Sequence, residues 1–150
     1  MNKFFILLLS FIILYGCGFK PMLVEKNYDI KFEKINTEGN YDINKKLKDK
    51  LIEKSNGSKI YDIYLNSDKN KEVVSSNEKG DPQKFKLIIK VNYEIYKEDT
   101  KLVVNLISKE TVYDNLTDKF ELSQYEENIQ NNLIENISSE ILLSLLEISS

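Results

Sequence analysis

The strongest structural signal in this chain is a strict alternation of side-chain polarity near its middle. Apolar residues occupy every second position from Phe85 to Ile95, and the residues between them are mostly polar. Because successive side chains of a strand point to opposite faces of a sheet, this period of two predicts a long strand with one buried face. The rest of the chain must supply an apolar layer that covers this face.

A second long strand follows after a short turn. Residues 97–100 are all polar, and apolar positions then return from Leu102 to Val112. This arrangement predicts an antiparallel hairpin. The segment 76–82, which precedes the first arm, is dense in turn-forming residues and is the clearest loop in the chain.

Two shorter segments upstream also alternate. Tyr28–Ile35 and Ile60–Leu65 each read as a strand with one buried face. The polar stretch after Leu65 contains Val73-Val74, which indicates that the second of these strands continues or resumes at the edge of the sheet.

Two segments show helical spacing. Residues 42–55 carry apolar side chains at four-residue steps, with Asn40 or Asp42 as the N-cap and Asn56-Gly57 as a left-handed stop. A longer helix opens at Ser123-Gln124-Tyr125-Glu126, a capping-box pattern. Its apolar stripe broadens near residues 141–143, so this part must be covered by its own domain, which we favour, or by a partner.

The resulting order is β-α-β-β-β-α. The predicted fold class is α+β, a two-layer sandwich in which two helices pack on one face of a four-stranded, mostly antiparallel sheet. The opposite face is predicted to be polar, and the hairpin arms are expected to project beyond the helices. The polar residues of the central strand are Lys84, Lys86, Lys90, Asn92 and Glu94.

The N-terminus resembles a bacterial lipoprotein signal. Lys3 precedes an apolar run at residues 4–14, which is too short to span a bilayer, and Leu14-Tyr15-Gly16-Cys17 resembles the lipobox. This predicts a signal peptide at 1–16, a lipidated N-terminus and tether at 17–27 with acylation of Cys17, and one domain at 28–150. Gly18 in place of aspartate implies sorting to the outer membrane. The alternatives are an ordinary secretory signal with an incidental cysteine, or an uncleaved anchor.

The composition argues against most catalytic and nucleic-acid functions. The chain has no histidine, arginine or tryptophan, and Cys17 is its one cysteine. Imidazole metal sites and Ser-His or Cys-His arrangements are therefore excluded, and we expect no metal, no cofactor and no enzyme activity. The chain has 24 acidic and 21 basic residues; loss of Lys3 leaves 24 − 20 = 4 net negative charges. Nucleic acid is accordingly an unfavourable partner.

Taken together, these features resemble the LptE family of lipopolysaccharide-assembly lipoproteins. The resemblance covers the whole mature chain and rests on the element order, the domain size and four segments. These segments are Cys17-Gly18-Phe19-Lys20-Pro21, the strand Phe85–Lys97, Tyr113-Asp114-Asn115 and the helix opening at Tyr125-Glu126. The Cys-Gly-Phe-x-Pro start is the most particular of them.

The resemblance implies a role in the envelope of a diderm bacterium. Members of this family plug the lumen of the outer-membrane barrel LptD, help it assemble and contact lipopolysaccharide through basic residues near loops at one end. Here the nearest candidates are Lys79 and Lys119, for which solvated loop lysines are the alternative interpretation. The implied location is the periplasmic side of the outer membrane, held by the lipid anchor. The competing functions are a lipoprotein that scaffolds another envelope complex and an enzyme with a Ser/Lys or paired-carboxylate site.

Overall fold

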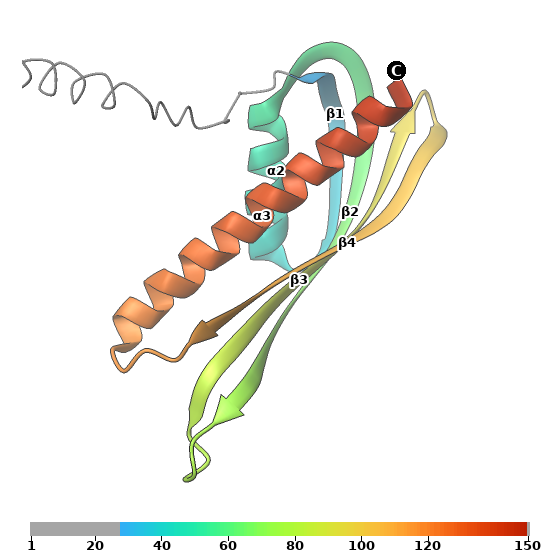
Figure 1. The fold of residues 1–150 in the computed structure, drawn as a ribbon. Helices are drawn as coiled ribbons and strands as arrows, with labels where there is room; N and C mark the ends of the chain where they lie inside the picture. Colours follow the sequence, from blue (N-terminus) through green and yellow to red (C-terminus); the bar gives the residue numbers. More distant parts are fainter. Residues whose placement is uncertain (1–27, 150) are drawn as a thin grey trace, which may run out of the picture.

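The computed structural model describes residues 28–149, in which two helices lie on one face of a four-stranded sheet (Figure 1). The elements are β1 (Tyr28–Gly39), α2 (Tyr41–Lys54), β2 (Ser55–Ser76), β3 (Pro82–Lys97), β4 (Thr100–Asp114) and α3 (Lys119–Ser149). The strand order is β1-β2-β3-β4; β1 runs parallel to β2, and the other two pairs are antiparallel. The predicted fold class is confirmed. The signal peptide 1–16, Cys17 and the tether to residue 27 lie outside the described residues.

The core lies between the sheet and the two helices. Its largest fully buried side chains come from both layers, and Tyr93 of β3 also donates its hydroxyl proton to Ser144 Oγ of α3 at 3.0 Å. Complete burial of an aliphatic side chain contributes roughly 1.5–3 kcal/mol, so this layer dominates the stability of the domain. The core includes Ile30, Leu47, Ile63, Leu65, Ile89, Ile95, Ile134, Ile137 and Ile141.

β2 is much longer than the alternation at Ile60–Leu65 alone predicts. It continues without a break to Ser76 because β3 provides a backbone partner all along it, from Asp62 opposite Tyr96 to Ser76 opposite Pro82. Beyond Ser67 every residue of β2 is exposed. The strands that reach beyond the helices, at the bottom of Figure 1, are therefore the outer parts of β2 and β3, and not the two arms of the predicted hairpin, β3 and β4.

Both ends of α2 agree with the predicted range 42–55 to within one residue, but the predicted stop signal is wrong. Asn40 Oδ1 accepts a hydrogen bond from Ile43 N at 3.1 Å, as expected for an N-cap. The predicted left-handed stop at Asn56-Gly57 is wrong, because Gly57 lies within β2 and has no positive φ. A Cβ on Gly57 would lie 2.3 Å from the backbone of Asp29. Glycine is thus required here by the close approach of β1 to β2.

α3 begins at Lys119, earlier than the capping box at Ser123 predicts. Asp118 is the residue that caps it, since its Oδ1 accepts hydrogen bonds from Phe120 N at 2.8 Å and Glu121 N at 3.0 Å. The 31-residue helix is about 46 Å long and crosses the sheet diagonally (Figure 1). It therefore connects the end of the domain that carries the β2–β3 loop with the end at which β1 begins.

Candidate interaction surfaces

One end of the domain, here called the hairpin end, combines the β2–β3 loop with the start of α3. Asn115 joins the two parts: its backbone N–H donates to Gln83 O and its Nδ2 to Pro82 O, both at 2.8 Å. The loop is shaped by Asn77, whose Oδ1 accepts from Lys79 N and Asp81 N at 2.9 Å each. These hydrogen bonds give the loop a defined turn.

Lys79 and Lys119 both lie at the hairpin end. Both residues are exposed, and neither ammonium group has a carboxylate within 4.0 Å among residues 28–149. The structure thus brings the two sequence candidates to one end of the molecule, where their charges are free to meet an anion. It does not place them around a shared pocket.

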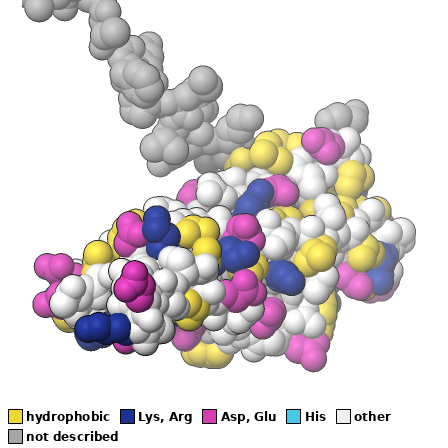
Figure 2. Space-filling model, turned by 60° about the horizontal axis from the view of Figure 1, so that its bottom comes forward, with side chains coloured by type: hydrophobic (Ala, Val, Ile, Leu, Met, Phe, Trp, Pro, Cys, Tyr) yellow, Lys and Arg dark blue, Asp and Glu magenta, His cyan; other side chains and the backbone are white. Residues whose placement is uncertain are grey.

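Exposed apolar side chains also occur at this end of the domain. Val73 and Val74 of β2 are 53% and 49% exposed, and Phe120, in the first turn of α3, is 71% exposed. Figure 2 brings this end forward and shows apolar, basic and acidic side chains interspersed rather than gathered into one charged patch. The sequence analysis did not single out Phe120. The pattern that could have indicated it is an aromatic residue that directly follows a capping aspartate and a lysine at the start of a helix.

Behind this surface a cluster that we call the aromatic clasp fixes α3 to the hairpin. It consists of Lys71, Phe85, Tyr113, Tyr125 and Glu126. The ammonium of Lys71 lies 4.0 Å from the Phe85 ring centre, and the Tyr113 hydroxyl donates to Glu126 Oε1 at 2.8 Å. Burial, together with this hydrogen bond, raises the pKa of Tyr113 well above its usual range. The clasp joins two motifs singled out in the sequence, Tyr113-Asp114-Asn115 and Tyr125-Glu126.

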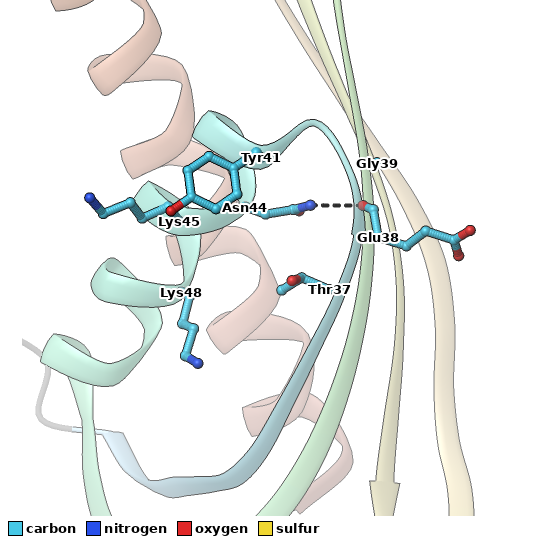
Figure 3. A pocket seen from close by; sticks show the side chains of 7 residues that line it. All are labelled: Thr37, Glu38, Gly39, Tyr41, Asn44, Lys45 and Lys48. Carbon is cyan, nitrogen blue, oxygen red and sulfur yellow. Dashed lines mark hydrogen bonds between the residues drawn. The ribbon is translucent and has the colours of Figure 1, made fainter.

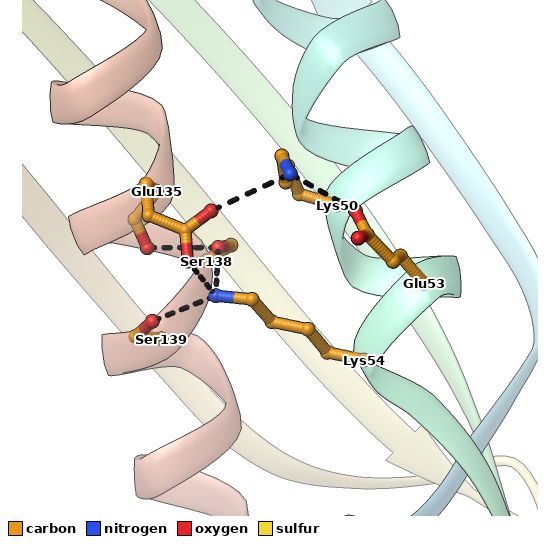
Figure 4. A network of polar contacts seen from close by, with 6 residues as sticks. All are labelled: Lys50, Glu53, Lys54, Glu135, Ser138 and Ser139. Atoms are coloured by element: carbon orange, nitrogen blue, oxygen red, sulfur yellow. Dashed lines mark hydrogen bonds and ion pairs between the residues drawn. The ribbon is translucent and has the colours of Figure 1, made fainter. Parts of the chain in front are cut away.

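A second polar network connects α2 to α3 (Figure 4). Lys54 Nζ forms an ion pair with Glu135 and lies 3.0 Å from Ser139 Oγ and 3.4 Å from Ser138 Oγ. Lysine and serine are the residue types of a Ser/Lys enzyme, but a nucleophile needs a neighbouring base with a free lone pair. Lys54 donates to its neighbours, and the fully buried Ser138 donates to the backbone oxygen of Glu135 at 2.9 Å. The network is therefore built to hold the two helices together.

A shallow depression of about 350 Å³ lies between the start of α2 and the end of β1 (Figure 3). Asn44 reaches across it and donates from Nδ2 to Glu38 O at 2.8 Å, while its Oδ1 is buried and has no donor among the described residues. Lys45 and Lys48 stand at the rim. Within residues 28–149 no group of three or more acidic, histidine or cysteine side chains is arranged to hold a metal ion.

Comparisons with known proteins identify the architecture. No protein-family model matches the sequence, and no curated protein matches it significantly. Rare lipoprotein B from Shewanella oneidensis superposes with a TM-score of 0.59 at 13% identity, covering 78% of this chain and 95% of that chain. A putative lipoprotein from Caulobacter crescentus gives 0.53 at 18%, covering 79% and 88%. A minor lipoprotein from Acinetobacter baumannii gives 0.52 at 16%, covering 75% and 90%. At these identities the likeness establishes the fold.

Proposed function

We propose that this chain is a lipid-anchored outer-membrane protein that plugs the lumen of the LptD barrel, helps it assemble and assists lipopolysaccharide delivery to the cell surface. The observation that carries the proposal is the combination of a lipobox ending in Cys17 with a fold shared by several bacterial proteins named as lipoproteins. Neither the lipobox nor the fold indicates a particular family of lipoproteins on its own. Together they support the LptE resemblance of the sequence.

The surface of the domain is compatible with a barrel lumen, which is polar in such proteins. The face of the sheet opposite the helices, predicted to be polar, is polar only in part: Lys90 and Asn92 of β3 are exposed there, but so are Val104 and Leu106 of β4, with Leu106 paired opposite Asn92. The outer side of α2 carries Lys45 and Lys48. A plug is surrounded by its barrel, so polar side chains on both layers suit the lumen, and the exposed apolar side chains of β4 would be covered by the barrel wall.

Lipopolysaccharide would be contacted at the hairpin end. Lys79 and Lys119 would approach the phosphates of lipid A as point charges, since the chain has no arginine for a bidentate contact. Val73, Val74 and Phe120 would lie against its acyl chains, because these apolar side chains are exposed at the same end of the domain. The proposed role requires no catalytic group, so we assign the protein no enzymatic activity.

The experiment that tests the plug is site-specific photo-crosslinking in cells. A photoreactive residue is placed at Asn92 on the open sheet face or at Lys48 on the outer side of α2, both exposed and on opposite layers. A plug should crosslink to the same large barrel from both positions. Crosslinks from one face alone, or to another envelope protein, would instead support the alternative of a lipoprotein that scaffolds a different complex.

A further inference from the structure

We infer that the last two turns of α3 contact the surface of a phospholipid bilayer beside the acylated N-terminus. This inference goes beyond the proposed function and rests on one part of it, the acylation of Cys17. The part of the domain concerned, here called the anchor end, comprises the start of β1, the β3–β4 turn and the C-terminal turns of α3, which Figure 1 shows together.

The length of the tether determines which end of the domain can lie near the membrane. β1 starts at Tyr28, so 28 − 17 = 11 residues separate it from the acylated cysteine. Such a segment spans at most about 40 Å when fully extended and about 18 Å on average. The hairpin end lies farther away by the length of α3, about 46 Å for its 31 residues. The tether therefore cannot let the domain stand on its hairpin end.

The anchor end has unpartnered apolar side chains to offer the membrane. The broad apolar stripe of α3 is mostly used by the core, since Leu142 and Leu145 are buried, but Leu143 and Ile148 remain 41% and 51% exposed. Because they are five residues apart, they lie on different sides of the helix, so the exposed apolar surface is split between two sides of the tip. Within the described residues no helix is long and apolar enough to cross a membrane. Shallow contact at the level of the headgroups is the arrangement that fits.

The charges at the anchor end indicate which lipids it accepts. Lys59 and Lys97 lie beside Glu33, Glu98 and Asp99 around one surface depression, so the two signs are mixed there. Glu147 adds a further acidic group to the last turn of α3. Such an end has no net attraction to anionic lipids. The contact should therefore form on zwitterionic phospholipids and change little with salt.

The test uses the complete acylated protein in vesicles of phosphatidylcholine and phosphatidylethanolamine. Acylation occupies the single native thiol, so a new cysteine can be labelled selectively with an environment-sensitive fluorophore. Ile148→Cys reports on the anchor end, and Val73→Cys, at 53% exposure, is the matched control on the hairpin. Leu143→Cys is a second reporter if labelling at Ile148 disturbs the helix end.

We expect a blue shift of the label at Ile148, with loss of intensity when spin-labelled phospholipid is included, and neither change at Val73. The mass of the purified chain establishes its acylation in the same sample. Two results with an acylated chain would overturn this inference and leave the proposed function intact. One is a label that is unquenched at both Ile148 and Leu143, and the other is a label at Val73 that is quenched as strongly as the label at Ile148. A chain without acyl groups overturns both the membrane contact and the proposed anchor.

Discussion

Reversing the charge of Lys79 and Lys119 at the hairpin end should weaken lipopolysaccharide binding without unfolding the domain. In Lys79→Glu/Lys119→Glu both replaced side chains are exposed and neither forms an ion pair with residues 28–149, so the fold loses no contact of theirs. Thermal unfolding of the variant should therefore resemble that of the parent protein. The free energy of lipopolysaccharide binding, and not that of unfolding, should therefore change.

The size of the effect follows from the exposure of the two sites. An exposed ion pair contributes about 0.5–1 kcal/mol, and a like-charge contact in its place costs a similar amount. Allowing for imperfect geometry, about 1 kcal/mol for each lysine gives about 2 kcal/mol together, or roughly a thirtyfold rise in Kd. Screening should reduce this difference as the salt concentration is raised.

The assay is titration of the full-length protein with fluorescent lipopolysaccharide in detergent. Lys45→Glu/Lys48→Glu is the matched control, since it makes the same change in net charge at two exposed lysines on the outer side of α2. A control that weakens binding as much would show that net charge, and not the hairpin end, is responsible. Unchanged binding by the hairpin-end variant would refute the assignment of both lysines.

Three further predictions concern stability and are measured by chemical or thermal denaturation. Gly57→Ala should destabilise the domain by about 2 kcal/mol or more, because its Cβ would lie 2.3 Å from the backbone of β1. Gly80→Ala, at φ +86° with no atom nearby, should cost only about 1 kcal/mol. Equal losses of stability in the two variants would contradict the close approach of β1 to Gly57. Tyr113→Phe should cost about 1–2 kcal/mol at neutral pH. Since folding raises the pKa of Tyr113, the parent should lose stability above about pH 10, where the unfolded chain releases this proton and the folded chain keeps it; an equally steep alkaline loss in the variant would show that another group titrates. Lys54→Met should destabilise the domain by about 1–2 kcal/mol and Lys50→Met by less than about 0.5 kcal/mol. Lys54 has three partners on α3, and its side chain is 21% exposed, whereas that of Lys50 is 41% exposed. A larger loss in Lys50→Met would contradict the role assigned to the network between the two helices.

The sequence was sufficient to predict the architecture because burial of apolar surface, the largest stabilising contribution to this fold, is visible in the periodicity of the chain. The alternation from Phe85 to Ile95 and the four-residue steps of the two helices determine which faces meet. Val73-Val74 correctly indicated that β2 continues after Leu65, but the unbroken length of its outer half could not be predicted, since its residues after Ser67 are exposed and its strand conformation depends on pairing with β3. Such pairing over a long distance in the chain leaves little trace in local composition.

Two of the errors lie at helix ends. Asn56-Gly57 has the residues of a helix stop, but Gly57 serves a close approach between two strands, which no pattern within one segment can reveal. At the other helix, Ser123-Gln124-Tyr125-Glu126 has the residues of a cap, but the helix begins within the polar stretch before it, where Asp118 is the residue that caps it. For the candidate site, residue type indicated Lys79 and Lys119, whereas the exposure of Phe120 and the aromatic clasp emerge from tertiary packing.

The most direct test of the proposed role is co-purification from detergent-solubilised outer membrane with a tag on the C-terminus of this chain. The plug model predicts that one large β-barrel remains bound at near one-to-one stoichiometry, together with lipopolysaccharide. Recovery of a different envelope complex, or of the chain without any barrel, would contradict the transport function, while the fold and the lipobox of the sequence would stand.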